Sequence, residues 1–302
     1  MISAEPKGFM WVNLLRCFVF YGFLFLIPTT VQAAEKTKIS QPARAVLLYD
    51  RKNNTIRQQL NINDQMPIAS ITKVMTVYTV LDSRAPLDEM LTVDRQKLET
   101  SKVLKIGSKV SRLELIQLSL IASDNLAAKL LAVHHPGGYE SFIAKMNSLA
   151  AGLGMVNTAF IEPTGLLQNT STAWDLHLLN KAATKYSIFR EAAMSKTLEA
   201  ESLNKRGIWE RVIVRNTSAF AGDYDIKVSK TGFTNPAGWC ITIMIEHQGH
   251  IFDLVVLGSP GKKIRNDLVL GYLKDYMNFI TRNSVIQKIN LIDTDTGFES
   301  AP

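Results

Sequence analysis

The sequence predicts an α+β fold within the broader α/β class, in which one antiparallel sheet is built from both ends of the chain. Short apolar, β-branched runs occur before residue 61 and again after residue 225, whereas helical periodicity dominates the middle. A content of 46% hydrophobic residues in 302 residues is enough for a substantial core. We therefore expect one domain at 34–282 with a helical lobe inserted at about 83–200, and then a polar C-terminal tail at 283–302.

The N-terminal segment has the pattern of a secretory signal peptide. Two basic residues precede the apolar run Cys17–Ile27, and small residues follow up to Ala33. The alternative is an uncleaved anchor, but that run is shorter than the roughly 20 residues that span a bilayer. We expect cleavage to remove 1–33, which would place the mature chain in the periplasm without a stable membrane span.

Loss of this segment removes Lys7, Arg16 and Glu5 and lowers the formal net charge from +7 to +6. A basic exported chain suits anionic surfaces such as cell wall or lipid headgroups. No arginine-rich run is present, and export argues against nucleic acid as a partner. Cys17 is lost too, so Cys240 alone remains and no intrachain disulfide can form.

The individual elements follow from periodicity and from turn residues. Ser111 and Glu114 form a capping-box pattern at the head of an apolar helix that ends at Ile121. A His-Gln-Gly-His loop between two β-branched runs predicts a hairpin. The expected strands are 43–50, 55–60, 211–214, 226–229, 239–246 and 251–258. The other expected helices are 70–81, 126–133, 139–149, 174–186 and 265–279.

A serine and a lysine within the stretch Met66–Thr76 predict a catalytic pair. Side chains three residues apart share one helix face, so the Ser70 hydroxyl can meet the Lys73 amine. Serine needs such an adjacent base to act as a nucleophile, and burial among apolar neighbours favours the neutral form of lysine. If Ser70 opens the helix, its N–H can also face a developing oxyanion.

The spacing alone is a weak signal, because Ser-x-x-Lys occurs three times in the chain. The match that begins at Ser202 lies in a polar run, and the one that begins at Ser259 contains a Pro-Gly pair that disfavours a helix. The match at Ser70 is the one with the apolar setting that the chemistry needs.

Two further motifs occur in a fixed order after this pair. A Ser-Asp-Asn triplet at 123–125 falls in a break between two expected helices, where its side chains can face a cleft. A Lys-Thr-Gly triplet at 230–232 follows an expected strand. Each triplet alone is commonplace, as a helix cap or a solvated strand end. All three motifs together are typical of class A β-lactamases and penicillin-binding proteins.

With these motifs the chain resembles the serine-type D-alanyl-D-alanine carboxypeptidases, which are low-molecular-mass penicillin-binding proteins. Lys230–Cys240 is most similar to the D-alanyl-D-alanine endopeptidase branch, as are Pro67–Ser70, His135–Tyr139 and Glu162–Leu166. The resemblance covers about 43–279 and implies a penicillin-binding/β-lactamase-like fold, a peptidoglycan peptide substrate, β-lactam inhibitors and no cofactor.

The resemblance also implies the catalytic roles. Ser70 would attack the carbonyl of a D-Ala peptide bond and become an acyl-ester, while Lys73 takes its proton. Ser123 would relay a proton to the leaving amine, and Asn125 would position Lys73 and the substrate amide. Endopeptidase and carboxypeptidase activities share this acyl-enzyme, so the motifs do not decide between them.

The implied substrate-binding residues come from the third motif and its neighbours. Lys230 and Thr231 would face the substrate carboxylate, and the charge of Lys230 would help to keep Lys73 neutral. The N–H groups of Ser70 and Phe233 would form the oxyanion hole. Gly232 has no side chain, so an extended substrate could lie along that strand edge.

Two positions bear on how well the family pattern fits. Trp174 stands before Asp175 where relatives usually have arginine, so a local ion pair would be missing. Arg265 falls where carboxypeptidase-type members place an arginine near the substrate carboxylate. The alternative for Arg265 is the first turn of a surface helix with no functional role.

Other functions compete with the peptidase. A class A-like β-lactamase would use a loop glutamate before proline to activate water, and Glu162 occupies such a place, although the residues after it, Thr164–Leu166, favour the peptidase. A non-catalytic cell-wall-binding protein would keep the cleft. We expect no metal, because the five histidines form no helical His-x-x-x-His pattern with a third ligand.

Overall fold

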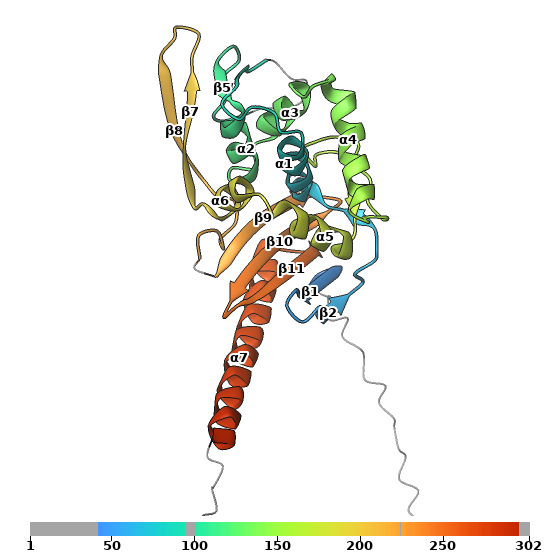
Figure 1. Ribbon diagram of the computed structural model, residues 1–302. Coiled ribbons are helices and arrows are strands. Elements are labelled where there is room, and N and C mark those ends of the chain that lie inside the picture. The colour runs from blue at the N-terminus through green and yellow to red at the C-terminus, as the bar shows by residue number, and fades with distance from the viewer. Residues whose placement is uncertain (1–41, 95–100, 224, 296–302) are drawn as a thin grey trace, which may run out of the picture. The chain divides into compact units, whose positions relative to one another are not determined.

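The computed structural model describes residues 42–94, 101–223 and 225–295 (Figure 1). Its main sheet has five antiparallel strands in the order β2-β1-β11-β10-β9. Strands from the two ends of the chain meet where β1 pairs with β11, which confirms the predicted sheet. The strands are β1 Ala45–Asp50, β2 Thr55–Leu60, β9 Ile226–Thr234, β10 Gly238–His247 and β11 His250–Ser259.

The main sheet separates two apolar clusters, because successive side chains of a strand point to opposite faces. In β1, Leu47 belongs to the larger cluster, whereas Val46 and Leu48 belong to the smaller one. The β10–β11 hairpin closes through Gln248 and Gly249, whose φ values of 47° and 73° give the type I′ turn that fits strand twist. The predicted hairpin is therefore confirmed.

Helices of the middle of the chain cover the face with the larger cluster. Ser111 caps α2 as predicted, since its hydroxyl accepts the Glu114 N–H at 3.1 Å. The helix expected at 174–186 is α5, which ends at Ala183, and a separate helix that was not predicted, α6, begins at Ser187. These elements are η1 Ala69–Ile71, α1 Thr72–Asp82, α2 Arg112–Leu120, α3 Asn125–Val133, α4 Gly138–Gly152, α5 Ala173–Ala183 and α6 Ser187–Met194.

A second sheet, in the order β4-β5-β7-β8, corrects part of the prediction. The strand expected at 211–214 exists as β8, but it pairs with β7 and does not join the main sheet. β7 spans the expected end of the helical lobe near residue 200, where the sequence predicted no strand, and its Leu-, Ala- and Glu-rich sequence favours a helix. Pairing with the β-branched residues of β8 overrides that helical preference. The small strands are β3 Met66–Pro67, β4 Met90–Thr92, β5 Lys109–Ser111, β6 Thr170–Ser171, β7 Thr197–Leu203 and β8 Trp209–Arg215.

The C-terminal helix α7, Lys262–Asp295, is longer than predicted. The sequence predicted an end near Phe279 and a polar tail from 283, but the helix continues through 283–295. No proline or glycine occurs between Tyr272 and Asp295 to end it. The predicted signal peptide and residues 296–302 of the predicted tail lie outside the described residues. Among the helices of the described ranges, none is both long and apolar enough to cross a membrane.

Candidate active site

Ser70 is the middle residue of the short 3-10 turn η1, which directly precedes α1. The preceding residue, Ala69, has a φ of 47°, which L-residues other than Asn and Asp rarely adopt. Two glycines make room for this turn. A Cβ on Gly165 would lie 1.9 Å from the Ala69 oxygen, and a Cβ on Gly232 would lie 2.9 Å from the Ile68 oxygen. Segments far apart in sequence therefore hold Ser70 in a strained turn.

Lys73 lies one helical turn after Ser70 and is fully buried. Its Nζ is 2.9 Å from Ser70 Oγ, 2.7 Å from Asn125 Oδ1 and 2.7 Å from the Thr164 carbonyl oxygen. Burial lowers the pKa of Lys73 from 10.5 to about 7, although the charge of Glu162 partly opposes the shift. Near neutral pH much of this amine is unprotonated and can accept the proton of the serine hydroxyl.

The second and third motifs meet across the same site. Lys230 Nζ is 2.8 Å from Ser123 Oγ and 2.9 Å from the Thr231 carbonyl oxygen. Ser123 has a φ of 56°, and Asp124 caps α3 by accepting the Ala127 N–H at 2.9 Å. Burial lowers the pKa of Lys230, and the neighbouring charge of Lys73 lowers it further.

A cavity of about 340 Å³ opens onto these groups. Arg265 is buried and donates to the Cys240 carbonyl at 3.2 Å, so it lies in the cavity wall and not on an exposed helix surface. Three predicted site residues lie behind the cavity lining. Lys73 hydrogen-bonds to Ser70 and Lys230 to Ser123, and Asn125 accepts a hydrogen bond from Lys73. The lining residues are Ser70, Ser123, Thr217, Thr231, Gly232, Phe233, Trp239, Lys262 and Arg265.

Three of these lining residues were missed by the sequence reasoning. Thr217 lies 2.8 Å from Thr231 between the hydroxyl oxygens, and Trp239 stacks on Phe233 with ring centroids 4.3 Å apart. Lys262 was considered only as the end of a rejected Ser-x-x-Lys match. Trp239 could have been found from the β9–β10 hairpin register, which places it opposite Phe233. The other two residues carry no signal at the sequence level.

The Glu162 carboxylate is buried, and all its hydrogen-bond donors come from its own loop. This arrangement disfavours the hypothesis of a β-lactamase. One carboxylate oxygen accepts the N–H and the hydroxyl of Thr164 at 2.7 and 2.6 Å. The other accepts the Gly165 N–H and the Asn169 side-chain amide. With four donors in place, this carboxylate has no oxygen left to activate a water. Its role is to shape the loop whose Thr164 carbonyl faces Lys73.

Asp175 keeps hydrogen-bond partners although Trp174, and not the arginine expected from the resemblance, precedes it. Asp175 accepts the Asn157 N–H at 2.9 Å and the Thr158 hydroxyl at 2.7 Å, so its carboxylate is satisfied locally. The indole of Trp174 instead packs edge-on against Tyr49, with ring centroids 5.7 Å apart. The missing ion pair is thus replaced by neutral hydrogen bonds and ring packing.

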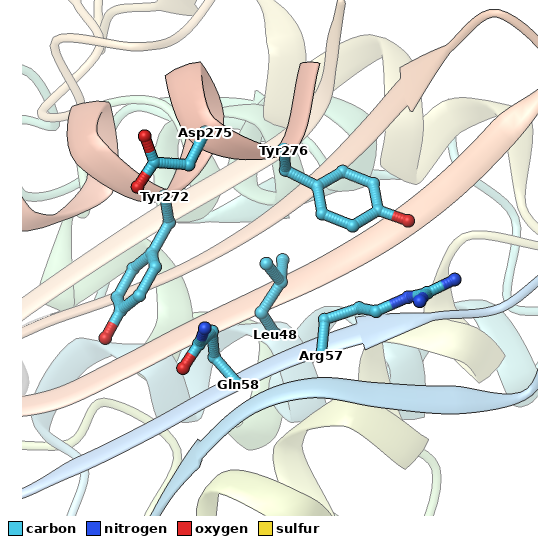
Figure 2. A pocket seen from close by; sticks show the side chains of 6 residues that line it. All are labelled: Leu48, Arg57, Gln58, Tyr272, Asp275 and Tyr276. Carbon is cyan, nitrogen blue, oxygen red and sulfur yellow. The ribbon is translucent and has the colours of Figure 1, made fainter. Parts of the chain in front are cut away.

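A second cavity, of about 240 Å³, lies between β1, β2 and α7 (Figure 2). Two tyrosines and an aspartate project from α7 over Leu48, as Figure 2 shows. The lining contains no serine, cysteine, histidine or lysine, so it holds no pair of the Ser70–Lys73 type. The lining residues are Leu48, Arg57, Gln58, Tyr272, Asp275 and Tyr276. Within the described residues, no group of three metal-ligating His, Cys, Asp or Glu side chains occurs either.

A serine in a strained turn, a buried lysine at hydrogen-bond distance and a second lysine–serine pair across a cavity define an active-serine acyl-transfer enzyme. The comparisons with known proteins give the family. The model of the D-alanyl-D-alanine carboxypeptidase family matches residues 30–261. The D-alanyl-D-alanine endopeptidase of Escherichia coli is 36% identical over 255 residues, which are 80% of this chain and 81% of that relative.

Solved structures agree with this match. The Streptomyces K15 DD-transpeptidase is 27% identical with a TM-score of 0.70, over 75% of this chain and 93% of that one. Penicillin-Binding Protein D2 of Listeria monocytogenes, in its ampicillin-bound form, is 26% identical with a TM-score of 0.68, over 77% and 96% of the two chains. The chain therefore belongs to the D-alanyl-D-alanine carboxypeptidase family and is a serine hydrolase. The resemblance expected from the motifs is confirmed.

Proposed function

We propose that this enzyme hydrolyses D-alanyl peptide bonds of peptidoglycan stem peptides through an acyl-enzyme on Ser70. The observation that carries the proposal is the position of the Lys73 amine, buried and within 2.9 Å of the Ser70 hydroxyl. The family membership and the Lys230–Ser123 pair across the cavity support it. A β-lactam would enter the same cavity and acylate the same serine.

In the first step, Lys73 takes the hydroxyl proton as Ser70 Oγ bonds to the carbonyl carbon of the substrate. The N–H groups of Ser70 and Phe233 hold the resulting oxyanion. Such preorganised donors contribute most when the charge develops in a site that excludes water. Asn125 Oδ1, 2.7 Å from Lys73 Nζ, keeps the amine aimed at the serine.

In the second step, the C–N bond breaks and the leaving amine takes a proton. Ser123 delivers that proton, which Lys73 collected from Ser70, and Lys230 at 2.8 Å orients the Ser123 hydroxyl. Water then attacks the ester carbon, returns the Ser70 hydroxyl and releases the peptide with a new carboxylate. Arg265 and Thr231, both in the cavity lining, recognise the carboxylate on the leaving side.

We further propose that residues 1–33 are a cleaved signal peptide, that residues 34–282 form the catalytic domain, and that the enzyme works in the periplasm. The apolar N-terminal run and the similarity to D-alanyl-D-alanine endopeptidases support this location. The same acyl-enzyme serves a cross-linked peptide and a monomer that ends in D-Ala-D-Ala. The two activities differ in the leaving amine alone.

The test is to incubate the protein purified from the periplasm with cross-linked muropeptide dimers and, separately, with pentapeptide monomers. Mass spectrometry of the products should show cleaved dimers, loss of one alanine from the monomers, or both. The Ser70→Ala variant should release neither product while it stays folded by circular dichroism. Turnover of either substrate by folded Ser70→Ala would overturn the proposal.

A further inference from the structure

The closed end of the β7–β8 hairpin carries exposed side chains that the acyl-transfer site does not use. The hairpin turn 204–208 lies beside the loop that precedes β5, because Lys105 of that loop is 2.8 Å from Glu210 of β8 (Figure 1). The two segments line a groove of about 430 Å³. We call six residues at this place the hairpin-tip patch. Five of them line the groove, and the sixth, Trp209, begins β8 directly after it: Lys105, Ile106, Lys205, Arg206, Ile208 and Trp209.

The apolar half of the hairpin-tip patch is open to solvent. The exposed fractions are 44% for Ile106, 56% for Ile208 and 55% for Trp209. Single exposed apolar residues are common on soluble proteins, but Ile106 and Ile208 line one groove from adjacent loops, and Trp209 follows Ile208 as the first residue of β8. Three exposed apolar side chains at one hairpin tip indicate a binding surface. Further along β8, Ile213 is 73% exposed, so the apolar character extends down the strand from the tip.

The charged half of the patch is basic and has little to neutralise it. The Lys205 side chain packs against the Gly107 backbone, because a Cβ on Gly107 would lie only 2.1 Å from Lys205 Cε. Lys205 is one of the residues that line the groove. Glu210 is already paired with Lys105. Among the residues that the structure describes, neither Lys205 nor Arg206 has an ion-pair partner.

We propose that the hairpin-tip patch docks on an anionic phospholipid surface. Tryptophan and isoleucine side chains would enter the boundary between headgroups and acyl chains, and the free cations would stay at the level of the phosphates. This mixture is what membrane interfaces select. An apolar protein surface would bind the apolar half of the patch alone, and a polyanionic glycan would bind the basic half alone. A lipid surface matches both halves at once.

The test is co-sedimentation of the protein, purified from the periplasm, with two kinds of vesicle. One is phosphatidylcholine alone, and the other is phosphatidylcholine that contains phosphatidylglycerol. We expect binding to the anionic vesicles only, with affinity reduced roughly tenfold or more in K205E/R206E. An I208S/W209S variant should lose binding as well. K181E/K185E makes the same charge change at two exposed lysines beside the end of α5 and should bind like the parent.

A second measurement separates insertion from simple charge attraction. Brominated phosphatidylglycerol should quench tryptophan fluorescence in the parent protein, and this quenching should disappear in W209F while vesicle binding persists. Acylation by penicillin at the parental rate verifies that each variant is folded. Equal binding to both kinds of vesicle, equal loss in K181E/K185E, or unchanged quenching in W209F would each overturn the proposal.

Discussion

Lys73 is the base that we propose for the site, because its amine contacts the Ser70 hydroxyl, the Asn125 amide oxygen and the Thr164 carbonyl. In water the pKa of a lysine side chain is 10.5, so the amine would keep its proton at neutral pH and could not serve as a base. Burial lowers the pKa to about 7, and in this structure it is the largest cause of the shift. From the sequence we expected burial, helped by the charge of Lys230, to keep this amine neutral. In the structure burial is the largest cause, and the charges of Glu162 and Asp124 oppose it.

The rate of acylation by penicillin should therefore rise with pH and level off above a pH of about 7. Deprotonation of Lys73 supplies the base, so below that pH the rate should fall roughly tenfold per pH unit. Stopped-flow measurement with a fluorescent penicillin checks this profile. Lys73→Arg, which keeps the charge but cannot lose it, should not be acylated at any of these pH values. A profile that is flat through pH 7 would contradict the assignment of Lys73 as base.

The motif residues could be predicted from sequence because each depends on local spacing in a recognisable context. Ser70 and Lys73 share a helix face, and the two triplets carry the partners that meet them. Thr217 and Lys262 could not be found that way, and Trp239 could be found only through the β9–β10 pairing that places it opposite Phe233. They reach the cavity from three separate segments, and their approach depends on how the main sheet, α7 and the loop after β8 pack together.

At the scale of elements, the loop between α4 and β6 is organised by Glu162. Glu162→Gln puts an amide group where a carboxylate now accepts N–H and O–H donors, so the free energy of unfolding should fall by about 1–3 kcal/mol. The lifetime of the penicilloyl-enzyme should stay unchanged, because this side chain does not activate water. Urea denaturation and the recovery of free enzyme after acylation measure the two quantities.

Glu191→Gln on α6 is the matched control, since this glutamate is exposed. It should leave both the stability and the acyl-enzyme lifetime as they are in the parent. If Glu162→Gln instead lengthens the lifetime of the acyl-enzyme, then Glu162 takes part in deacylation. The β-lactamase-like alternative would then return.

The turn that carries Ser70 also depends on close backbone packing at Gly165. Gly165→Ala adds a Cβ at a φ of +85° and 1.9 Å from the Ala69 oxygen. We expect a loss of roughly 3 kcal/mol or more of stability, with acylation reduced in whatever folds. Gly152→Ala is the control, because nothing lies within 4 Å of its added methyl and its φ is not positive. Urea titration of both variants checks the contrast, and equal stability would contradict it.

The main-sheet strands were predictable because their β-branched runs and turn residues agree with the final pairing. β7 was not, since its Leu-, Ala- and Glu-rich sequence favours a helix and becomes a strand through pairing with β8. The length of α7 was underestimated for another reason. The apolar spacing weakens after Phe279, but no residue there ends a helix, so the backbone continues to Asp295.

For the whole molecule, the N-terminal strands and the C-terminal helix are tied together at Asp50. This buried carboxylate accepts the Tyr276 hydroxyl at 2.8 Å and Arg57 at 3.0 Å. Burial raises its pKa, but the hydrogen bonds from Tyr276, Asn53 and Arg57 outweigh burial and hold it at about 2. The folded state therefore favours the ionised form more strongly than the unfolded chain does.

This shift has a defined consequence for acid stability. A depressed carboxyl pKa contributes stability that is fully present above the ordinary value of 3.8 and is lost as the pH falls through about 2. Tyr276→Phe removes one donor, so it should destabilise the protein more at neutral pH than at a pH of about 2. Urea denaturation across this range checks the difference. An effect of Tyr276→Phe that does not change with pH would contradict the role given to Asp50.

The whole account depends on an acyl-ester at Ser70, formed where the three motifs converge on one cavity. The most direct measurement is mass spectrometry of the protein after incubation with penicillin, followed by proteolytic mapping of the adduct. We predict a mass increase of one intact penicillin, located on the peptide that contains Ser70, and no increase in Ser70→Ala. An adduct on any other residue, or labelling that persists in Ser70→Ala, would contradict the account.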